Sequence, residues 1–459
     1  MVQKEIGVEP LLRDAASRAT RYLQALPERR VSPAPSALEG LGRFSRPLQD
    51  PPLAAAEVLE ELDTIGSPAT VASAGGRYFG FVVGGSLPAA LAANILAAAW
   101  DQNAGLEIAS PVGAALEKVC RTWITDLFGL PTEAEVGFVT SATMANFTGL
   151  AAARHTLLQR QGWDVEARGL FGAPPITVIV GDEVHVSLLK ALSMLGLGRA
   201  RVVRVPVDGQ GRMIPAQIPQ IESPTVVCLQ AGNVSTGAFD AADEIASKLQ
   251  GTGAWIHVDG AFGLWAAASP ARRHLASGVE RADSWATDAH KWLNVPYDSG
   301  LVIVRDKRHL NAAMSSSAAY LIEGETRDPH LFVPEMSRRA RAIEIWAALR
   351  SLGRSGLADL IDRSCDQARR FADALGEAGH HVLNEVVLNQ VLVSFGTAEI
   401  TRRVIATIQE DGTCWCGGTV WQGKTAMRIS VSSWATTDRD VSRSIDAILR
   451  IAREAQSPA

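Results

Sequence analysis

Residues 255–261 read Trp255-Ile256-His257-Val258-Asp259-Gly260-Ala261. A short run of apolar and β-branched residues that ends on an acid is typical of a buried strand. Functional residues of α/β folds gather at the carboxyl ends of parallel strands, and the small residues after Asp259 leave room for a flat ligand. The run therefore predicts a central strand with Asp259 in a functional site. A helix cap or a buried ion pair is the alternative role of this acid.

Similar short runs recur through the middle of the chain. They lie at residues 137–141, 177–180, 202–207, 225–230, 284–287 and 301–304, in addition to 255–259. Helix-like segments separate several of them, at residues 143–159, 186–195 and 240–249. Strands that alternate with helices predict an α/β fold with a mostly parallel, seven-stranded sheet flanked by helices.

The two ends of the chain follow other patterns. Residues 1–66 combine helix-like segments with a proline-rich linker and predict an N-terminal helical arm. Residues 67–330 then form the large domain, and residues 331–459 a smaller α+β C-terminal domain. In that small domain we expect helices at 336–352, 362–378 and 441–454 and strands at 391–395 and 427–431.

Composition limits the classes of function. A net charge of −5 with scattered arginines gives no basis for binding nucleic acid or an anionic membrane. The five cysteines form no disulfide framework, and Cys414 and Cys416 have poor spacing for zinc, so we predict no metal site. The N-terminus lacks the apolar core of a signal peptide, and the apolar run 89–100 is too short to span a bilayer. We expect a cytoplasmic protein.

The run 284–287 leads into Thr287-Asp288-Ala289-His290-Lys291-Trp292. Of the seven lysines, Lys291 alone lies between an imidazole and an indole. Desolvation disfavours the ammonium form of a lysine, and Schiff-base chemistry requires the neutral amine. Lys291, together with Asp259 aimed at a pyridine nitrogen, predicts a site for pyridoxal phosphate (PLP).

Two further strand ends carry polar residues. Thr140-Ser141-Ala142-Thr143 joins a strand to a helix, where free N–H groups and the helix dipole favour a phosphate. The alternative is plain helix capping by Ser141 or Thr143. His185, at the end of another strand, could stack on a cofactor ring or be structural. We interpret His257, two residues before Asp259, as a supporting or core histidine.

The four elements follow the order phosphate cradle, stacking histidine, ring-nitrogen acid, lysine. In this order the chain resembles the PLP-dependent group II amino acid decarboxylases, which include aromatic amino acid and glutamate decarboxylases and have the type I aminotransferase fold. The resemblance covers about residues 70–445 and also rests on Gln230-Ala231-Gly232-Asn233 and Arg428-Ile429-Ser430.

The resemblance implies roles for individual residues. Lys291, Asp259, His185 and Tyr320 are the implied catalytic residues, with Tyr320 on a mobile loop from which it protonates the α-carbon. Because this loop reaches the partner's site in the family, a homodimer with shared active sites is implied. The implied cofactor-binding residues are Ser141, Ala142, Thr143, His185, Asn233, Asp259, Ala261, His290 and Lys291.

Two residues depart from the family pattern. Asp288 stands where many relatives have an asparagine near the phosphate, and an ionised aspartate there would repel the phosphate. Asp288 therefore either points away or is neutralised by a neighbouring arginine. Met144 replaces an acidic residue that is common after the phosphate cradle.

The predicted reaction is the PLP-dependent decarboxylation of an L-amino acid to an amine. The expected substrate-binding residues are Phe79, Phe81, Trp100, Asn103 and Arg428. Their region is apolar, with Arg77 as its one evident basic residue, so we favour an aromatic or uncharged substrate; for Arg428, a structural ion pair is an equal alternative. The rival functions are oxidative decarboxylation–deamination to an aldehyde, transamination, and an inactive PLP-binding scaffold.

Overall fold

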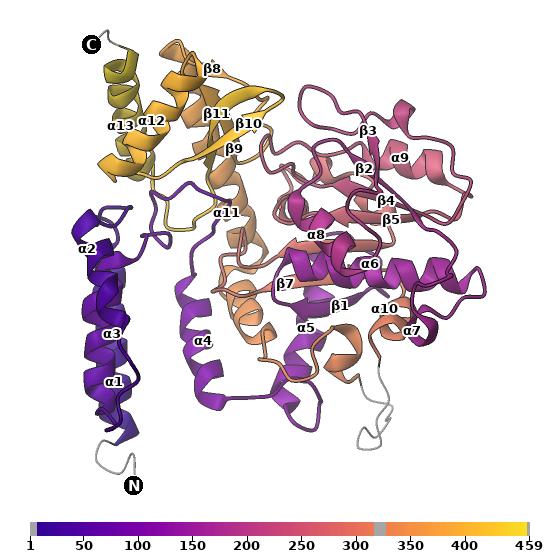
Figure 1. Cartoon of the computed structure of the whole chain (residues 1–459), viewed down its shortest axis with the longest axis horizontal. Coiled ribbons are helices and arrows are strands. Elements are labelled where there is room, and N and C mark those ends of the chain that lie inside the picture. The colour runs from indigo at the N-terminus through magenta and orange to yellow at the C-terminus, as the bar shows by residue number, and fades with distance from the viewer. Residues whose placement is uncertain (1–6, 316–326, 457–459) are drawn as a thin grey trace. The chain divides into compact units, whose positions relative to one another are not determined.

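The structure, a computed structural model, describes residues 7–315 and 327–456 (Figure 1). Its contacts divide the chain into two compact units. The first combines Met1–Val83, Arg370–Val382 and Val393–Ala459, and the second combines Gly84–Arg369 with Leu383–Leu392. The expected division into an arm, a large domain and a small domain stays a prediction.

The second unit is built on a seven-stranded sheet of described residues, in the order β1-β7-β6-β5-β4-β2-β3. Its strands are β1 (Glu135–Val139), β2 (Thr177–Gly181), β3 (Val203–Val205), β4 (Thr225–Gln230), β5 (Trp255–Asp259), β6 (Ser284–Asp288) and β7 (Gly300–Val304). Neighbouring strands are parallel except that β7 is antiparallel to both β1 and β6. The predicted mostly parallel sheet is confirmed. The bounds of each strand predicted for this sheet differ from those of the observed strand by two residues or fewer.

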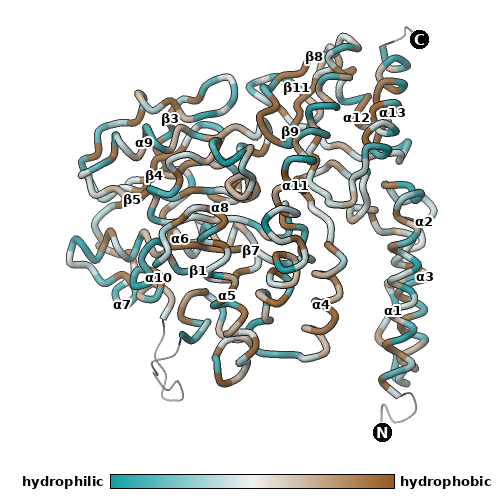
Figure 2. Tube along the Cα trace, turned by 180° about the vertical axis from the view of Figure 1, so that it is seen from behind, coloured by the Kyte–Doolittle hydropathy of each residue, from teal (hydrophilic) through white to brown (hydrophobic). Residues whose placement is uncertain are grey.

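The second unit also contains helices, several of which cover this sheet. They are α4 (Pro88–Trp100), α5 (Pro111–Leu127), α6 (Ala142–Gln159), α7 (Val165–Arg168), α8 (Val186–Met194), α9 (Ala242–Leu249), α10 (Lys307–Met314) and α11 (Ala342–Glu377), whose last residues belong to the first unit. Helix α6 packs on β1, β5, β6 and β7, and Figure 2 shows hydrophobic residues along the central strands and α6. Small residues let α6 approach the sheet closely: a Cβ at Gly149 would lie 3.1 Å from Cε1 of His257.

The carboxyl ends of six strands share one edge of the sheet, because β1 to β6 run in the same direction. The register aligns Gln230 with Asp259, and Asp259 with Ala286. Asp288 and Val139 both pair with Gly300, from opposite sides of β7. The predicted site residues that follow these strands therefore gather at this edge.

The prediction of a helix at 336–352 was wrong in its first turn and a half, since α11 begins at Ala342. The preceding residues are held by long-range partners instead. Arg338 donates to the carbonyl of Phe138 and pairs with the buried Glu117 at 2.5 Å, and Arg341 pairs with Asp298 at 2.9 Å. Helical periodicity is a local pattern of the sequence and gives no information about these distant partners. The rest of the helix predicted at 336–352 and the helix predicted at 362–378 both overlap α11, which is interrupted at Gly353 (φ 61°).

The first unit combines helices with a four-stranded sheet, in the order β10-β11-β9-β8. Its elements are α1 (Val8–Ala25), α2 (Pro35–Gly40), α3 (Ala55–Ala69), β8 (His381–Val382), β9 (Gln390–Ser394), α12 (Ala398–Asp411), β10 (Gly417–Trp421), β11 (Lys424–Ser430) and α13 (Asp438–Gln456). The first residues of β9, up to Leu392, belong to the second unit. The sequence predicted β9 and β11 but not β8, which has two residues, or β10, which begins with two glycines.

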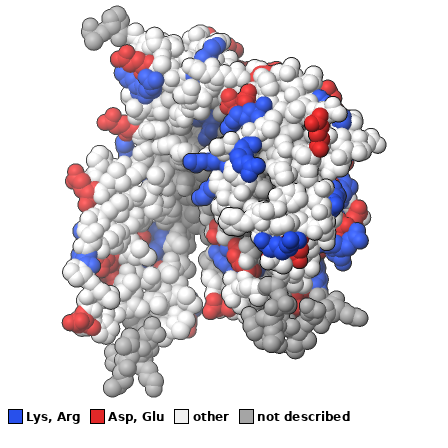
Figure 3. Space-filling view, turned by 45° about the vertical axis from the view of Figure 1, so that its right-hand side comes forward, with Lys and Arg blue, Asp and Glu red and all other residues white. Residues whose placement is uncertain are grey.

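The surface shows no segregation of charge in the view of Figure 3, where basic and acidic side chains lie interspersed among uncharged ones. Among the helices of residues 7–315 and 327–456, none combines the length and the apolar character needed to cross a membrane.

Candidate active site

Lys291 lies in the turn that follows β6. Its Nζ is 3.0 Å from Oδ2 of Asp288, and its side chain is 19% exposed, so a ligand can reach the amine. Its neighbour Trp292 is fully buried and anchors the turn. Gly84 packs on the same turn, because a Cβ there would lie 1.9 Å from the carbonyl oxygen of Lys291. Sequence reasoning missed Gly84, for which the Gly84-Gly85 pair was the available signal.

Asp259 ends β5 and is 5% exposed. Its Oδ2 accepts a hydrogen bond from Nδ2 of Asn146 at 3.0 Å, and its Oδ1 accepts one from the N–H of Ala261 at 3.2 Å. Both oxygens therefore have fixed donors. The carboxylate is held in one orientation at the carboxyl edge of the sheet.

A buried chain of hydrogen bonds stands behind Asp259. Trp255 Nε1–H donates to Ser284 Oγ at 2.8 Å, Ser284 Oγ lies 2.8 Å from His257 Nδ1, and His257 Nε2 lies 2.8 Å from Asn146 Oδ1. Because the Asn146 amide donates to Asp259, its oxygen is the acceptor for His257 Nε2–H. His257 Nδ1 then accepts the Ser284 hydroxyl. Every donor in this chain meets an acceptor, ending at the carboxylate.

Burial also keeps the histidine in this chain of hydrogen bonds uncharged. His257 is fully buried, and desolvation lowers its pKa to about 3. The imidazole is therefore neutral near pH 7, as the hydrogen-bond directions require. The structure gives His257 a supporting position. Sequence reasoning missed Asn146, for which the available signal was a single amide among the mostly small and apolar residues at the start of α6.

The N-terminus of α6 lies beside Lys291. Ser141 precedes the helix without making a side-chain cap. Instead Asp288 Oδ1 accepts the N–H of Ala142 at 2.5 Å. Gly300 of β7 allows the backbone at Ser141 to pack closely against this strand, since a Cβ at position 300 would lie 2.5–2.8 Å from backbone atoms of Ser141. The alternative role of Ser141 as a plain helix cap is not what the structure shows.

Asp288 is 2% exposed and pairs with a lysine. The expectation that it points away or is neutralised by an arginine was wrong, because the turn after β6 brings Lys291 back to it. His290 Nε2 lies 3.6 Å from Asp288 Oδ1, while His290 Nδ1 accepts the N–H of Ser299 at 3.1 Å. Burial lowers the pKa of His290, against the opposing effect of Asp288. Lys291 is thus the cationic partner of Asp288.

His185 follows β2 on the same edge and begins α8. Its Nδ1 accepts the N–H of Ser187 at 3.2 Å and lies 2.7 Å from the hydroxyl of Ser187. The structure therefore shows a capping histidine with a fixed ring and a partly buried side chain.

Asn233 is buried in the turn after β4. Its Oδ1 accepts the N–H groups of Ser235 at 2.8 Å and Thr236 at 3.2 Å. The turn closes at Asp240, whose carboxylate accepts the N–H groups of Met213 and Gln230. Burial raises the pKa of Asp240 to about 6. The hydrogen bonds to Oδ1 of Asn233 thus fix the shape of the loop after β4.

The residues at this edge fit PLP. Ser299 Oγ is a buried hydroxyl for which the described residues offer no hydrogen-bond partner, and it lies next to Gly300 beside the α6 N-terminus. The edge also supplies an oriented carboxylate at Asp259, a reachable amine at Lys291 and a helix N-terminus that already holds an anionic group. Ala261 and Thr143 line the same strand ends and are partly buried.

Comparison with known proteins identifies the family of the chain. The sequence profile described as the pyridoxal-dependent decarboxylase conserved domain matches residues 44–397. The chain belongs to this family. The protein is therefore a PLP-dependent amino acid decarboxylase, a lyase, and PLP is its cofactor.

Individual relatives of this decarboxylase differ in substrate. An aromatic-L-amino-acid decarboxylase of Bacillus atrophaeus is 28% identical over 385 residues, 79% of this chain and 76% of that protein. An L-2,4-diaminobutyrate decarboxylase of Rhizobium meliloti (strain 1021) is 30% identical over 390 residues, 80% of this chain and 76% of that protein. The crystal structure of Oryza sativa TDC with PLP and tryptamine has a TM-score of 0.91 at 22% identity, covering 100% of both chains. This likeness confirms the predicted fold.

Three predicted substrate-binding residues of the decarboxylase belong to the first unit. Phe79 is fully buried against Phe371, with ring centroids 5.0 Å apart. Phe81 is 64% exposed and lies beside Trp415. Arg428 is in β11, opposite Gly417, and burial lowers its pKa.

Arg77 also belongs to the first unit, where it is 3% exposed. Its guanidinium donates to the carbonyl oxygens of Pro27, Arg29 and Thr413. The interpretation of Arg77 as a basic group available to a substrate was wrong, because these carbonyls occupy its donors.

The other two predicted substrate-binding residues lie in the second unit. Trp100 is 46% exposed at the end of α4. Asn103 donates to Ser337 Oγ and accepts the N–H groups of Gly105 and Arg338, so it braces two loops. Tyr320 lies outside the described residues.

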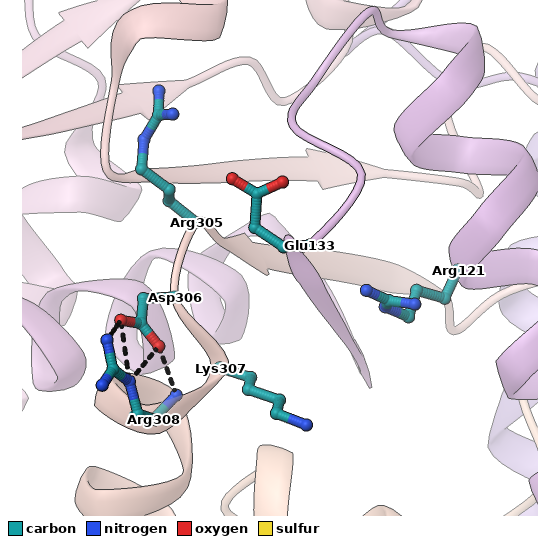
Figure 4. Close-up of a pocket in the computed structure, with 6 residues that line it drawn as sticks. All are labelled: Arg121, Glu133, Arg305, Asp306, Lys307 and Arg308. Atoms are coloured by element: carbon teal, nitrogen blue, oxygen red, sulfur yellow. Dashed lines mark hydrogen bonds and ion pairs between the residues drawn. The ribbon is translucent and has the colours of Figure 1, made fainter.

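A basic surface pocket lies at the other edge of the sheet, where β7 ends (Figure 4). It is lined by Arg121, Glu133, Arg305, Asp306, Lys307 and Arg308. Its arginines already have partners: Arg308 pairs with Asp306, and Arg305 donates to the carbonyls of Glu280 and Ala282. Since the candidate site lies at the opposite strand ends, we assign this pocket no part in it.

Proposed function

We propose that the decarboxylase acts on an aromatic or uncharged L-amino acid, with Lys291, Asp259, His185 and Tyr320 as its catalytic residues. The observation that carries this proposal is the pairing of β5 with β6, which brings the oriented Asp259 carboxylate and the reachable Lys291 amine to one edge of the sheet.

Each residue has a defined task in the proposal. PLP, when bound, supplies a ring that accepts electrons from the substrate. Asp259, fixed by Asn146 and Ala261, holds a proton on the ring nitrogen. Lys291 would hold the cofactor, and Tyr320 or Lys291 would donate a proton to the α-carbon in place of the carbon dioxide that leaves. His185, with its ring fixed by Ser187, would stack on the cofactor.

The phosphate ligands in the proposal are Ser141, Ala142 and Thr143 at the start of α6. A helix N-terminus offers unpaired N–H groups and a favourable dipole to an anion. His290 lies close to this group, and Asn233 holds the neighbouring loop in shape. Ala261 gives the ring access to Asp259, because its methyl group is the only side-chain atom at that position.

The substrate preference rests on the character of the predicted pocket region. Phe79, Phe81 and Trp100 are aromatic, and Arg77 is occupied by backbone carbonyls. An acidic side chain would require a free cation there. The relatives are decarboxylases of aromatic amino acids and of diaminobutyrate, so a substrate screen decides this point.

We also propose a cytoplasmic homodimer with shared active sites. Large apolar side chains are exposed on the helices, such as Leu12 of α1 (57%), Leu62 of α3 (57%) and Ile95 of α4 (56%). Exposed apolar surface of this kind marks protein interfaces. Light scattering coupled to size exclusion should give twice the chain mass; a monomer that retains full activity would contradict the shared site.

The decisive experiment is product analysis from a pool of amino acids incubated with enzyme and PLP. We expect carbon dioxide and one amine, and no turnover in Lys291→Ala. Lys307→Ala, at the other edge of the sheet, is the matched control and should remain active. Full activity of Lys291→Ala would overturn the proposal. Ammonia and peroxide with an aldehyde would favour the oxidative reaction, and a strong preference for glutamate or aspartate would overturn the substrate class.

A further inference from the structure

Asp288 contacts the groups that an anionic ligand of α6 would use. Its Oδ1 accepts the N–H of Ala142, the first residue of α6, at 2.5 Å. Its Oδ2 lies 3.0 Å from the ammonium of Lys291. The first N–H groups of a helix have no partner within the helix and attract anions. A side-chain carboxylate therefore sits at the proposed phosphate position.

Positive charge at this position is limited. In the described parts of the chain, the ion-pair partners of Asp288 are Lys291 and His290. Burial lowers the pKa of His290, which leaves that imidazole neutral near pH 7. A phosphate monoester carries about two negative charges at this pH. A carboxylate and a phosphate at the same helix N-terminus would repel each other strongly in a partly buried space.

Only the side chain of Asp288 is free to respond. Its N–H donates to the carbonyl of Ala261 at 2.9 Å, and its own carbonyl accepts Trp265 Nε1–H at 2.9 Å. The backbone is thus held within β6, next to Gly300 of β7. Relief of the repulsion has to come from rotation of the carboxylate away from Ala142.

We infer that Asp288 competes with the phosphate of PLP for the N-terminus of α6, and that its carboxylate turns away from Ala142 when the phosphate binds. Asp288 then acts as an internal anion that lowers the affinity for the cofactor. The inference rests on the proposed phosphate ligands Ser141, Ala142 and Thr143.

Asp288→Asn tests the charge while keeping the shape. An asparagine retains an oxygen that can accept the Ala142 N–H, but it carries no negative charge. Asp283→Asn is the matched control. Asp283 stands just before the other end of β6, and its carboxylate likewise accepts a backbone N–H, from Ile256 at 2.8 Å. Asp288→Ala is a second variant in case the asparagine changes the stability of the protein.

The experiment measures the binding of three probes to cofactor-stripped protein: PLP, pyridoxal and inorganic phosphate. Cofactor absorbance and the shift of Tm report binding. We expect Asp288→Asn to bind PLP and inorganic phosphate about tenfold more tightly than the wild type, because a like charge is removed. Pyridoxal, which lacks the phosphate, should bind with an affinity within about twofold of the wild type. Asp283→Asn should match the wild type for all three probes.

Other outcomes would overturn the inference. Unchanged or weaker binding of PLP and phosphate by both Asp288 variants would mean that the carboxylate does not compete. An equal gain for PLP and pyridoxal would mean that the effect is not directed at the phosphate. Failure of the wild type to bind either PLP or pyridoxal would instead contradict the proposed site, which makes the two failures distinguishable.

Discussion

Asp259 and Asp288 end neighbouring strands of one sheet, but the structure holds them in opposite ways. Asp259 accepts hydrogen bonds from two uncharged donors, and one of these belongs to a buried chain that includes a neutral histidine. Asp288 faces an ammonium and a helix N-terminus. Neutral, fully paired surroundings favour a carboxylate with one fixed orientation. Where the charged partners of a carboxylate can also bind an anionic ligand, as at Asp288, the ligand can replace the carboxylate at those partners.

The largest effect should come from removing the fixed charge. We predict that Asp259→Asn lowers kcat/KM by roughly 10²–10³-fold, the range seen when one electrostatic group at a reacting centre is lost. Steady-state kinetics on the substrate found in the screen measures this loss.

Asp240→Asn is the matched control, because Asp240 is also buried and accepts two hydrogen bonds, from Met213 and Gln230. Each of the two Asp→Asn substitutions should lower the unfolding free energy by about 1–3 kcal/mol, because a buried hydrogen-bond donor loses its acceptor. Only Asp259→Asn should lose activity. Equal kinetic losses in both variants would remove the distinction between a charge at the site and a buried polar contact.

The next effect concerns the residue that orients Asp259. Asn146→Leu should leave Asp259 Oδ2 and His257 Nε2–H without their partners, both in buried surroundings. We expect a loss of about 2–6 kcal/mol of unfolding free energy and about tenfold in kcat. Urea denaturation and kinetics measure the two.

Thr156→Val provides the control on the same helix, since Thr156 is buried and its hydroxyl donates to the carbonyl of Ala152. It should cost about 1 kcal/mol and leave kcat unchanged. If Asn146→Leu destabilises the protein but keeps kcat and the cofactor absorbance, Asn146 supports the fold alone.

The comparison also shows which features were predictable from the sequence. The seven strands and the residues at their ends could be predicted because periodicity and strand order are local properties of the chain. The chain of hydrogen bonds behind Asp259 could not, because Asn146 and His257 are 111 residues apart and meet only when α6 packs on β5.

The partner of Asp288 illustrates a second limit. From the sequence, an aspartate there should repel a phosphate, so its side chain was predicted either to point away or to be neutralised by an arginine. The observed partner is Lys291, three residues later. A contact at this spacing outside a helix depends on the path of the turn after β6, which residue types do not determine. The predicted start of α11 was wrong for a similar reason. Arg338 and Arg341 pair with acids that are distant in the sequence, and helical periodicity does not predict such pairs.

The smallest effect should be a pH dependence of stability, which His257 provides on the Asp259 side of the comparison. His257 has a pKa lowered to about 3 by burial, while a histidine in the unfolded chain titrates near 6.5. Between pH 6.5 and 3 the unfolded state therefore binds a proton that the folded state does not. Stability rises with pH across this window and is lost as the pH falls, by about 1.4 kcal/mol per pH unit for this group.

His257→Asn removes this proton from the balance. We expect a lower unfolding free energy at every pH, but a slope between pH 4 and 6 that is shallower than that of the wild type by up to about 1.4 kcal/mol per unit. Replacing the exposed His274 by asparagine should leave the wild-type slope. Denaturant titrations at several pH values give the slopes, and identical slopes in the wild type and His257→Asn would mean that His257 gains its proton in the folded protein. In that case His257 could not donate from Nε2 alone, and the neutral chain that holds Asp259 would be charged like the surroundings of Asp288.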